Sequence, residues 1–431
     1  MRRTAPEPHG SVRFAPPVPE QGLPVLPELA AVLAAAAGLH AEDPEGGGDE
    51  IRDASCGYWL RRGLPCETHD VLAAPGAQPL LLALAAAVGG DALVPRPCPA
   101  WWVPALRLLG RSVYHAPAPP ECGGVPDPYA LLETVRRVRA EGGAPRLLLL
   151  CPVDDPTATV APPELVHEVC EAAVGEGLHI ISDETWRDTV HRPHDTVLVS
   201  PAEMFPEHVT VVCDLSGAFL PSGWPAAVAR LPAGRYGARA DALDVLAALR
   251  AVVPTPVAAA AAYALREPPP VADRVAAAAA LHAELAAAVH RTVLGAGGIA
   301  RPPQAGRHLY ADIAAPGISD SLELEDRLGA RLGVPAPGGH RFGDELGGLR
   351  VRLSTGPLLG AAPEERLAAL RSPTPLQLPH VQEELRALAV ALDELRRTPP
   401  RTDENPGTDT GPARPGPGPP GPAEARESRD E

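Results

Sequence analysis

The chain has 431 residues and a formal net charge of −16, and hydrophobic residues make up 45% of it. This length can bury a large core in two or three domains, which excludes a peptide, a disulfide miniprotein and a simple coiled coil. The acidic balance argues against non-specific nucleic-acid binding, which usually needs a basic surface.

Composition divides the chain into four parts. Residues 1–28 are rich in proline and we expect an extended leader there, whereas residues 399–431 form a Pro/Gly tail. The tail should be disordered, because it carries too few apolar residues to offset its ordering entropy. Between these ends we predict a large domain over residues 61–289. A smaller α/β domain should form from residues 29–60 and 290–398, near the two ends of the chain.

Strand and helix signals alternate along the large domain. The continuous apolar run 147–151 is typical of a strand that is covered on both faces. Such alternation predicts an α/β fold with a mostly parallel sheet and helices on both faces. The other predicted strands are 92–95, 111–115, 178–182, 209–213 and 226–230. The predicted helices are 75–88, 100–109 and 162–174.

The second domain follows an Ala-rich helix over residues 275–289. Its predicted strands lie near residues 308–313 and 349–354, and a long helix over 378–396 closes it. In a parallel sheet, functional groups collect at the carboxyl ends of the strands. Asp155, Asp183 and Ser216 all fall at such ends, so we expect a site there.

All 38 basic residues are arginine, and the chain contains no lysine. No side-chain amine is therefore available to form a Schiff base. Seven cysteines without paired spacing indicate buried thiols in a reducing, cytoplasmic location. We expect no secretory signal and no membrane span, since apolar runs such as 79–88 are too short.

No metal site is predicted. Cys66 with His69, and His167 with Cys170, supply only two possible ligands each, whereas zinc needs three or four in register. The second pair lies on an amphipathic predicted helix, where packing is the simpler explanation.

Five segments, in this order, resemble motifs of the class I/II aminotransferases, the pyridoxal-phosphate-dependent enzymes of fold type I. The resemblance covers roughly residues 40–397. It implies the family's two-domain fold, a homodimer with the site at the interface, pyridoxal phosphate as cofactor and an amino-acid-like substrate. The five segments are 76–78 (GAQ), 151–158 (CPVDDPTA), 182–187 (SDETWR), 214–224 (DLSGAFLPSGW) and 351–354 (VRLS).

The resemblance assigns cofactor-binding roles to the first segment and to the fourth. Backbone N–H groups of Gly76, Ala77 and Gln78, at the start of a helix, would hold the cofactor phosphate. Ser216 would add a hydroxyl to the same phosphate.

Other positions would hold the ring and the substrate. By the resemblance, Asp183 pairs with the pyridinium nitrogen, which keeps the ring an electron sink. Asp155 and Trp186 stand beside the ring hydroxyl. Arg352 clamps the substrate carboxylate, because a guanidinium can make a bidentate pair with it.

The sequence departs from the family pattern at the positions that form the Schiff base and hold the cofactor. Gly217 stands where the family has the Schiff-base lysine, and Pro225 stands where it has a phosphate-binding arginine. Asp155 replaces an asparagine and Trp186 a tyrosine, and segment 40–46 lacks the tyrosine of the arm that reaches a partner's phosphate. Losing two phosphate contacts costs about 3–6 kcal/mol of binding free energy. This corresponds to a loss of cofactor affinity of roughly a hundredfold to ten-thousandfold.

The family therefore implies transamination of amino acids, while these residues predict an inactive or non-standard protein. One alternative is an enzyme that uses the cofactor non-covalently. A second is a pseudoenzyme that acts as a binding or scaffold partner in a biosynthetic pathway. A third is a ligand-sensing regulator, although residues 1–50 show no helix-turn-helix pattern.

Overall fold

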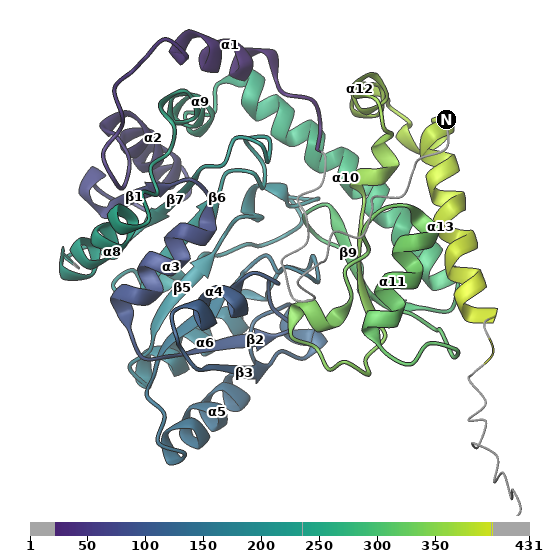
Figure 1. The fold of residues 1–431 in the computed structure, drawn as a ribbon, viewed down its shortest axis with the longest axis horizontal. Coiled ribbons are helices and arrows are strands. Elements are labelled where there is room, and N and C mark those ends of the chain that lie inside the picture. The colour runs from purple at the N-terminus through teal and green to yellow at the C-terminus, as the bar shows by residue number, and fades with distance from the viewer. Residues whose placement is uncertain (1–21, 235, 398, 400–431) are drawn as a thin grey trace, which may run out of the picture.

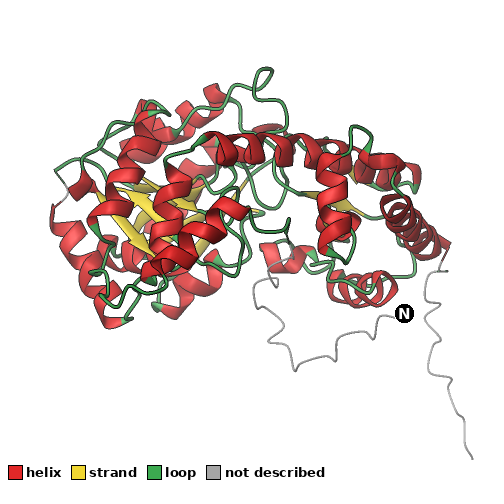
Figure 2. Cartoon of the chain, turned by 90° about the horizontal axis from the view of Figure 1, so that it is seen from above, coloured by secondary structure: helices red, strands yellow, loops and turns green. Residues whose placement is uncertain are grey.

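A computed structural model describes residues 22–234, 236–397 and 399 of the chain. The predicted tail beyond residue 399, and the leader up to residue 21, lie outside the described residues. Figure 1 shows two lobes, a larger one built around a sheet and a smaller one, with helix α10 (Pro269–Gly295) running between them. In Figure 2 the strands of each lobe lie inside a covering of helices.

The large lobe contains a seven-stranded sheet in the order β1-β7-β6-β5-β4-β2-β3. Strands β3, β2, β4, β5 and β6 run parallel, whereas β7 pairs antiparallel with both β6 and β1. This confirms the mostly parallel sheet of an α/β fold. The strands are β1 (Val71–Ala74), β2 (Asp91–Arg96), β3 (Val113–Pro117), β4 (Pro145–Leu150), β5 (His179–Asp183), β6 (Val209–Asp214) and β7 (Ala227–Arg230).

Successive side chains of the buried strands enter two different cores. Leu148 and Leu150 of β4 belong to one core and Leu147 and Leu149 to the other, because neighbouring residues of a strand point to opposite faces. The helices of this lobe that pack on the two faces are α2 (Asp49–Leu60), α3 (Ala77–Val88), α4 (Trp102–Leu108), α5 (Pro128–Ala140), α6 (Pro163–Gly175), α7 (Pro201–Met204), α8 (Tyr236–Ala248) and α9 (Thr255–Leu265).

The N-terminal helices correct our expectation for residues 29–60. Helix α1 (Pro27–Ala36) and helix α2 both pack against α9 of the large lobe. Their residues Leu29, Ile51 and Trp59 are buried in the core of that lobe instead of the small one. The alanine-rich surface of α9 allows this close approach. Helix α1 also begins inside the stretch that we expected to be an extended leader.

The small lobe has its own core around a three-stranded antiparallel sheet in the order β10-β9-β8. Half of α10 contributes to this core, and Leu23 packs on it from the N-terminal side. No helix of the described residues is long and apolar enough to cross a membrane. The elements of this lobe are β8 (Ile299–Ala300), β9 (His308–Asp312), α11 (Ser321–Leu332), β10 (Arg350–Ser354), α12 (Pro363–Arg371) and α13 (Pro379–Arg397).

Candidate functional site

Three carboxylates meet where the parallel strands of the large sheet end. Asp155 follows β4, Asp183 ends β5 and Asp214 ends β6. They are close enough to interact, because the charges of Asp214 and Asp155 both raise the pKa of Asp183. The candidate site is therefore the carboxyl edge of the sheet, as expected for this type of fold.

Asp183 is buried at the centre of this edge. Its carboxylate accepts hydrogen bonds from the hydroxyl of Thr185 at 2.6 Å and from the backbone N–H of Thr185 at 3.1 Å. Burial raises the pKa of Asp183 to about 6, although the bonds from Thr185 act in the opposite direction. A cation beside this carboxylate would offset the cost of its burial, so the position suits the pyridinium partner that the resemblance implies.

The first turn of α3 is capped by a carboxylate of the chain itself. The N–H of Ala77 donates to Oδ2 of Asp214 at 2.8 Å, and the N–H of Ser216 donates to Oδ1 at 2.9 Å. Gly76 allows this approach with a φ of +105°, whereas the side chain of Gln78 is exposed. Helix N-termini attract anions through their unpaired N–H groups and the helix dipole. The predicted phosphate cradle thus already has an anion at its first N–H, namely Asp214.

Gly217 is packed directly against the backbone of the strand end beside it. A Cβ at Gly217 would lie 2.1 Å from the carbonyl oxygen of Thr185, and real Cβ atoms do not approach backbone so closely. The N–H of Gly217 also donates to the carbonyl of Asp214 at 3.1 Å, which closes the turn. The position that the resemblance gives to lysine has no room for any side chain unless the backbone moves.

Arg352 reaches from the small lobe to the large one. Its Nη1 donates to Oδ1 of Asp155 at 2.7 Å. Burial is the largest single influence and would raise the pKa of Asp155, but the charge and hydrogen bond of Arg352, together with the charges of His308 and Arg307, hold this pKa below its ordinary value. The imidazole Nε2 of His308 lies 3.7 Å from the same oxygen, and burial lowers the pKa of His308 to about 3. The predicted substrate-binding arginine is thus engaged by a carboxylate of its own chain.

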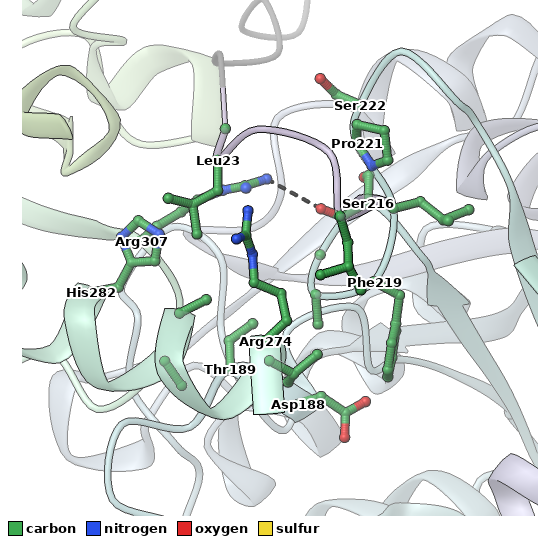
Figure 3. Close-up of a pocket in the computed structure, with 18 of the residues that line it drawn as sticks. Leu23, Asp188, Thr189, Ser216, Phe219, Pro221, Ser222, Arg274, His282 and Arg307 are labelled. Carbon is green, nitrogen blue, oxygen red and sulfur yellow. Dashed lines mark hydrogen bonds between the residues drawn. The ribbon is translucent and has the colours of Figure 1, made fainter. Parts of the chain in front are cut away.

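Trp186 and Ser216 contact the small lobe beside these groups. The ring of Trp186 packs edge-on against His308, with centroids 5.3 Å apart, and the guanidinium of Arg307 lies 5.2 Å from the ring. Arg307 also donates to the carbonyl of Ser216 at 3.3 Å. Trp186, Ser216 and Gly217 line one side of a cavity of about 340 Å³, part of which is drawn in Figure 3.

The residues at these positions do not fit pyridoxal phosphate as a covalently held cofactor. No lysine exists to bind it, and Gly217 leaves no space for one. A phosphate at the start of α3 would also meet the carboxylate of Asp214, and two anions at one helix end repel each other. Only Asp183 keeps a side chain of the type that the cofactor ring requires.

Sequence reasoning missed several residues that shape this site. Asp214 ends an apolar strand, which is the same signal that pointed to Asp183, so it could have been found. Thr185 lies within a segment that we had singled out. Arg307 and His308 gave no such signal, because they reach the site from a different lobe; Arg307 lies 91 residues from its partner Ser216 in the sequence.

The thiols and histidines form no metal centre in the part of the chain that the structure describes. Residues 22–234 and 236–397 contain no group of three His, Cys, Asp or Glu side chains placed to hold an ion. All seven cysteines are free thiols. The sulfurs of Cys56 and Cys66 lie 3.5 Å apart, within hydrogen-bonding distance for sulfur.

Comparison with known sequences places this geometry in context. The family model for aminotransferase class I and II matches residues 28–355. The probable aspartate/prephenate aminotransferase of Thermus aquaticus is 29% identical over 205 residues, which cover 46% of this chain and 50% of the relative. The aspartate/prephenate aminotransferase of Thermus thermophilus is 29% identical over 213 residues, 48% of this chain and 52% of the relative. The chain thus spans about half the length of the curated relatives it matches.

Solved structures show the same fold over nearly the whole chain. Aspartate aminotransferase from Thermus thermophilus with maleate superposes with a TM-score of 0.71 at 21% identity, covering 88% of this chain and 90% of that one. The aromatic aminotransferase from Pyrococcus horikoshii gives a TM-score of 0.71 at 19% identity, covering 88% and 94%. At this identity the likeness establishes the fold alone. Since the family model also spans most of the sequence, from α1 to β10, this chain belongs to the class I and II aminotransferase family.

Proposed function

We propose that this protein is a pseudoenzyme of the aminotransferase family: it keeps the fold, does not catalyse transamination, and binds pyridoxal phosphate at most weakly and non-covalently. The observation that carries the proposal is the carboxylate of Asp214, which accepts from the first N–H of α3 at 2.8 Å. Asp214 supplies an intramolecular anion to the helix end that would otherwise attract the cofactor phosphate.

The chemistry of the missing lysine also has no substitute among the neighbouring groups. In the family that residue moves a proton on the substrate, which requires a base whose pKa lies near the working pH. His308 approaches the site from the small lobe, but burial lowers its pKa to about 3, so it is a poor base at neutral pH. The carboxyl of Asp183, with a pKa of about 6, is held by Thr185.

An amino-acid ligand is disfavoured for a related reason. The curated relatives are named for aspartate and prephenate, so the family suggests an acidic or aromatic substrate with a carboxylate. In this chain Arg352 is bonded to Asp155 at 2.7 Å. A substrate carboxylate would have to displace an internal carboxylate that is already in place and pre-oriented.

The remaining role is binding rather than catalysis, and we propose a scaffold or binding partner in a biosynthetic pathway. We further propose that the protein is a homodimer, by analogy with the family, and that it is cytoplasmic, in keeping with its seven free thiols. Light scattering on the purified protein tests the dimer.

The test of the central proposal is a titration with pyridoxal phosphate followed by absorbance, with the wild type and Asp214→Ser compared. We expect weak binding or none by the wild type. Asp214→Ser should bind at least about tenfold more tightly, because it removes an anion and offers a hydroxyl at the same place.

The matched control is Asp127→Ser, since Asp127 caps α5 in the same way, through the N–H of Ala130 at 2.8 Å, outside the site. Both substitutions weaken a helix cap, but only the one at residue 214 should change cofactor affinity. Turnover of aspartate with a keto acid by the wild type, at rates typical of the relatives, would contradict the proposal outright.

A further inference from the structure

The cavity beside the Gly217 turn is built from both lobes and from the N-terminal strap, residues 22–26. Its other walls come from the turn 216–222, from α10, from α12 and from the residues just before β9. Its volume of about 340 Å³ lies at the lower end of the range for pockets that bind small ligands. Neither Asp183 nor Asp155 lines it, but it adjoins the carboxylate edge described above through Trp186, Ser216 and Gly217.

Arginines outnumber carboxylates among the described residues that line this cavity, although Arg307 and Arg366 also have interactions of their own. Three arginines line it, Arg274 of α10, Arg307 and Arg366 of α12, whereas Asp188 is the one carboxylate among its described lining residues. Asp188 is bonded to Arg62 at 2.5 Å and accepts from the hydroxyl of Tyr58 at 2.6 Å. In Figure 3 its carboxylate points away from Arg274 and Arg307, which both extend toward Leu23 and Ser216.

The positive charge of Arg274 has no carboxylate bonded to it among the residues that the structure describes. Its Nη2 donates to the carbonyl of Pro24 at 2.5 Å, which is a neutral acceptor. Burial lowers the pKa of Arg274, and the charge of Arg371 lowers it further. A partly buried cation that faces a neutral oxygen and another cation is stabilised when an anion reaches it.

Much of the remaining cavity wall is apolar, although Thr189, Ser222 and His282 also line it. Side chains from the strap, from α1, from the 216–222 turn and from α10 cover it with hydrocarbon, namely Leu23, Leu26, Leu29, Phe219, Leu220 and Val275. A ligand that complements both parts has one anionic end and an apolar body.

We propose that this cavity binds a small organic acid, with its carboxylate held by Arg274 and Arg307 and its apolar body against the strap and α10. The proposal deepens the proposed function and rests on it in one respect, because it makes ligand binding, not transamination, the task of this region.

Calorimetric titration of the full-length protein with octanoate, and with 1-octanol as its uncharged analogue, tests the proposal. We expect octanoate to bind and 1-octanol to bind at least about tenfold more weakly. Arg274→Gln should weaken octanoate binding about ten- to a hundredfold, the equivalent of one charge-assisted hydrogen bond. Arg291→Gln changes an exposed arginine of the same helix and should leave the affinity unchanged. Equal binding of the two probes, or an unaffected Arg274→Gln variant, would overturn the proposal.

Arg274→Gln also removes the hydrogen bond to Pro24 of the strap, so a second variant is needed that blocks the cavity without changing this contact. Ala278→Phe fills the cavity while it leaves every charge in place, so octanoate binding should be lost. Ala280→Phe, on the exposed side of α10, should bind octanoate like the wild type. If Ala278→Phe still binds normally, the acid lies elsewhere and the proposal fails.

The two proposals fail separately. Octanoate binding that depends on Arg274, in a protein that also transaminates, would overturn the proposed function and support this one. No octanoate binding, in a protein that also ignores pyridoxal phosphate, would overturn this one alone.

Discussion

The carboxylate edge and the neighbouring cavity differ in how their positive groups are paired. At the edge, two groups that the family uses to hold anions already have carboxylates of the chain bonded to them: Asp214 on the start of α3 and Asp155 on Arg352. In the adjoining cavity, guanidiniums outnumber carboxylates among the described lining residues. The comparison indicates that the first region stabilises the fold, while the second is suited to an anion from outside.

Under the proposed function, the residues at this edge serve to stabilise the fold. Removing a cofactor from a cationic cleft leaves buried positive groups that lower stability unless they are paired. Aspartates at positions 155 and 214 supply that pairing. The same aspartates would hinder cofactor binding, so a gain in stability at this edge comes with a loss of cofactor affinity.

The largest expected effect comes from breaking the pair between the lobes. Asp155→Ala leaves the half-buried Arg352 without this carboxylate and should lower the free energy of unfolding by up to about 3–5 kcal/mol. Asp312→Ala breaks an exposed pair with Arg350 on the neighbouring strands and should cost about 0–1 kcal/mol.

Urea unfolding measures both losses. Maleate should partly restore the Asp155→Ala variant, because Arg352 is then available to a carboxylate from solution. A loss below about 1 kcal/mol for Asp155→Ala would show that the pair contributes no more than a surface contact.

The next effect concerns the pH dependence of stability. The pKa of Asp183 is about 6 in the folded protein and 3.8 when unperturbed, so ionising this carboxyl costs the folded state more. Its contribution to stability is present at low pH and is lost as the pH rises from about 4 to about 6, by up to about 3 kcal/mol for two pKa units.

Asp183→Asn should remove this loss, and Asp195→Asn, at an exposed position, should not. The buried His282 and His308, whose pKa values are lowered to about 3, contribute in the opposite direction between pH 3 and 6.5. The variant must therefore be compared with the wild type at each pH by chemical unfolding. Parallel curves for Asp183→Asn and the wild type would contradict the shifted pKa.

The smallest of these effects tests the closed lysine position. Gly217→Ala places a Cβ 2.1 Å from the carbonyl of Thr185 and should lower the free energy of unfolding by about 1–3 kcal/mol. Gly223→Ala lies in the same loop with open space around it and should change stability by less than about 0.5 kcal/mol. Equal thermal unfolding of the two variants would mean that the turn adapts freely.

Much of the fold could be predicted from the sequence, because its signals are local. The apolar run 147–151 corresponds to β4, and the helix predicted over 378–396 is α13, displaced by one residue. The Ala-rich helix was predicted over 275–289, but α10 begins earlier, at Pro269, since proline is favoured in the first turn. Helices α1 and α2 were not predicted, and their packing on α9 depends on contacts more than 200 residues apart.

The site was less accessible to sequence reasoning. Motif order located Asp155, Asp183 and Arg352, yet the bond between Asp155 and Arg352 joins residues 197 positions apart. No local pattern encodes such a pair. The resemblance also directed attention to the absent lysine, so Asp214, three residues earlier, was quoted but given no role.

The contact between Gly217 and Thr185 has an evolutionary consequence. A codon change that restored lysine would meet the Thr185 carbonyl before it could reach any ligand. The benefit of an amine would appear only after the neighbouring loop had shifted and Asp214 had also been replaced. Each single substitution would lower stability before it helped catalysis, so under the proposed function a return to transamination would need several simultaneous changes.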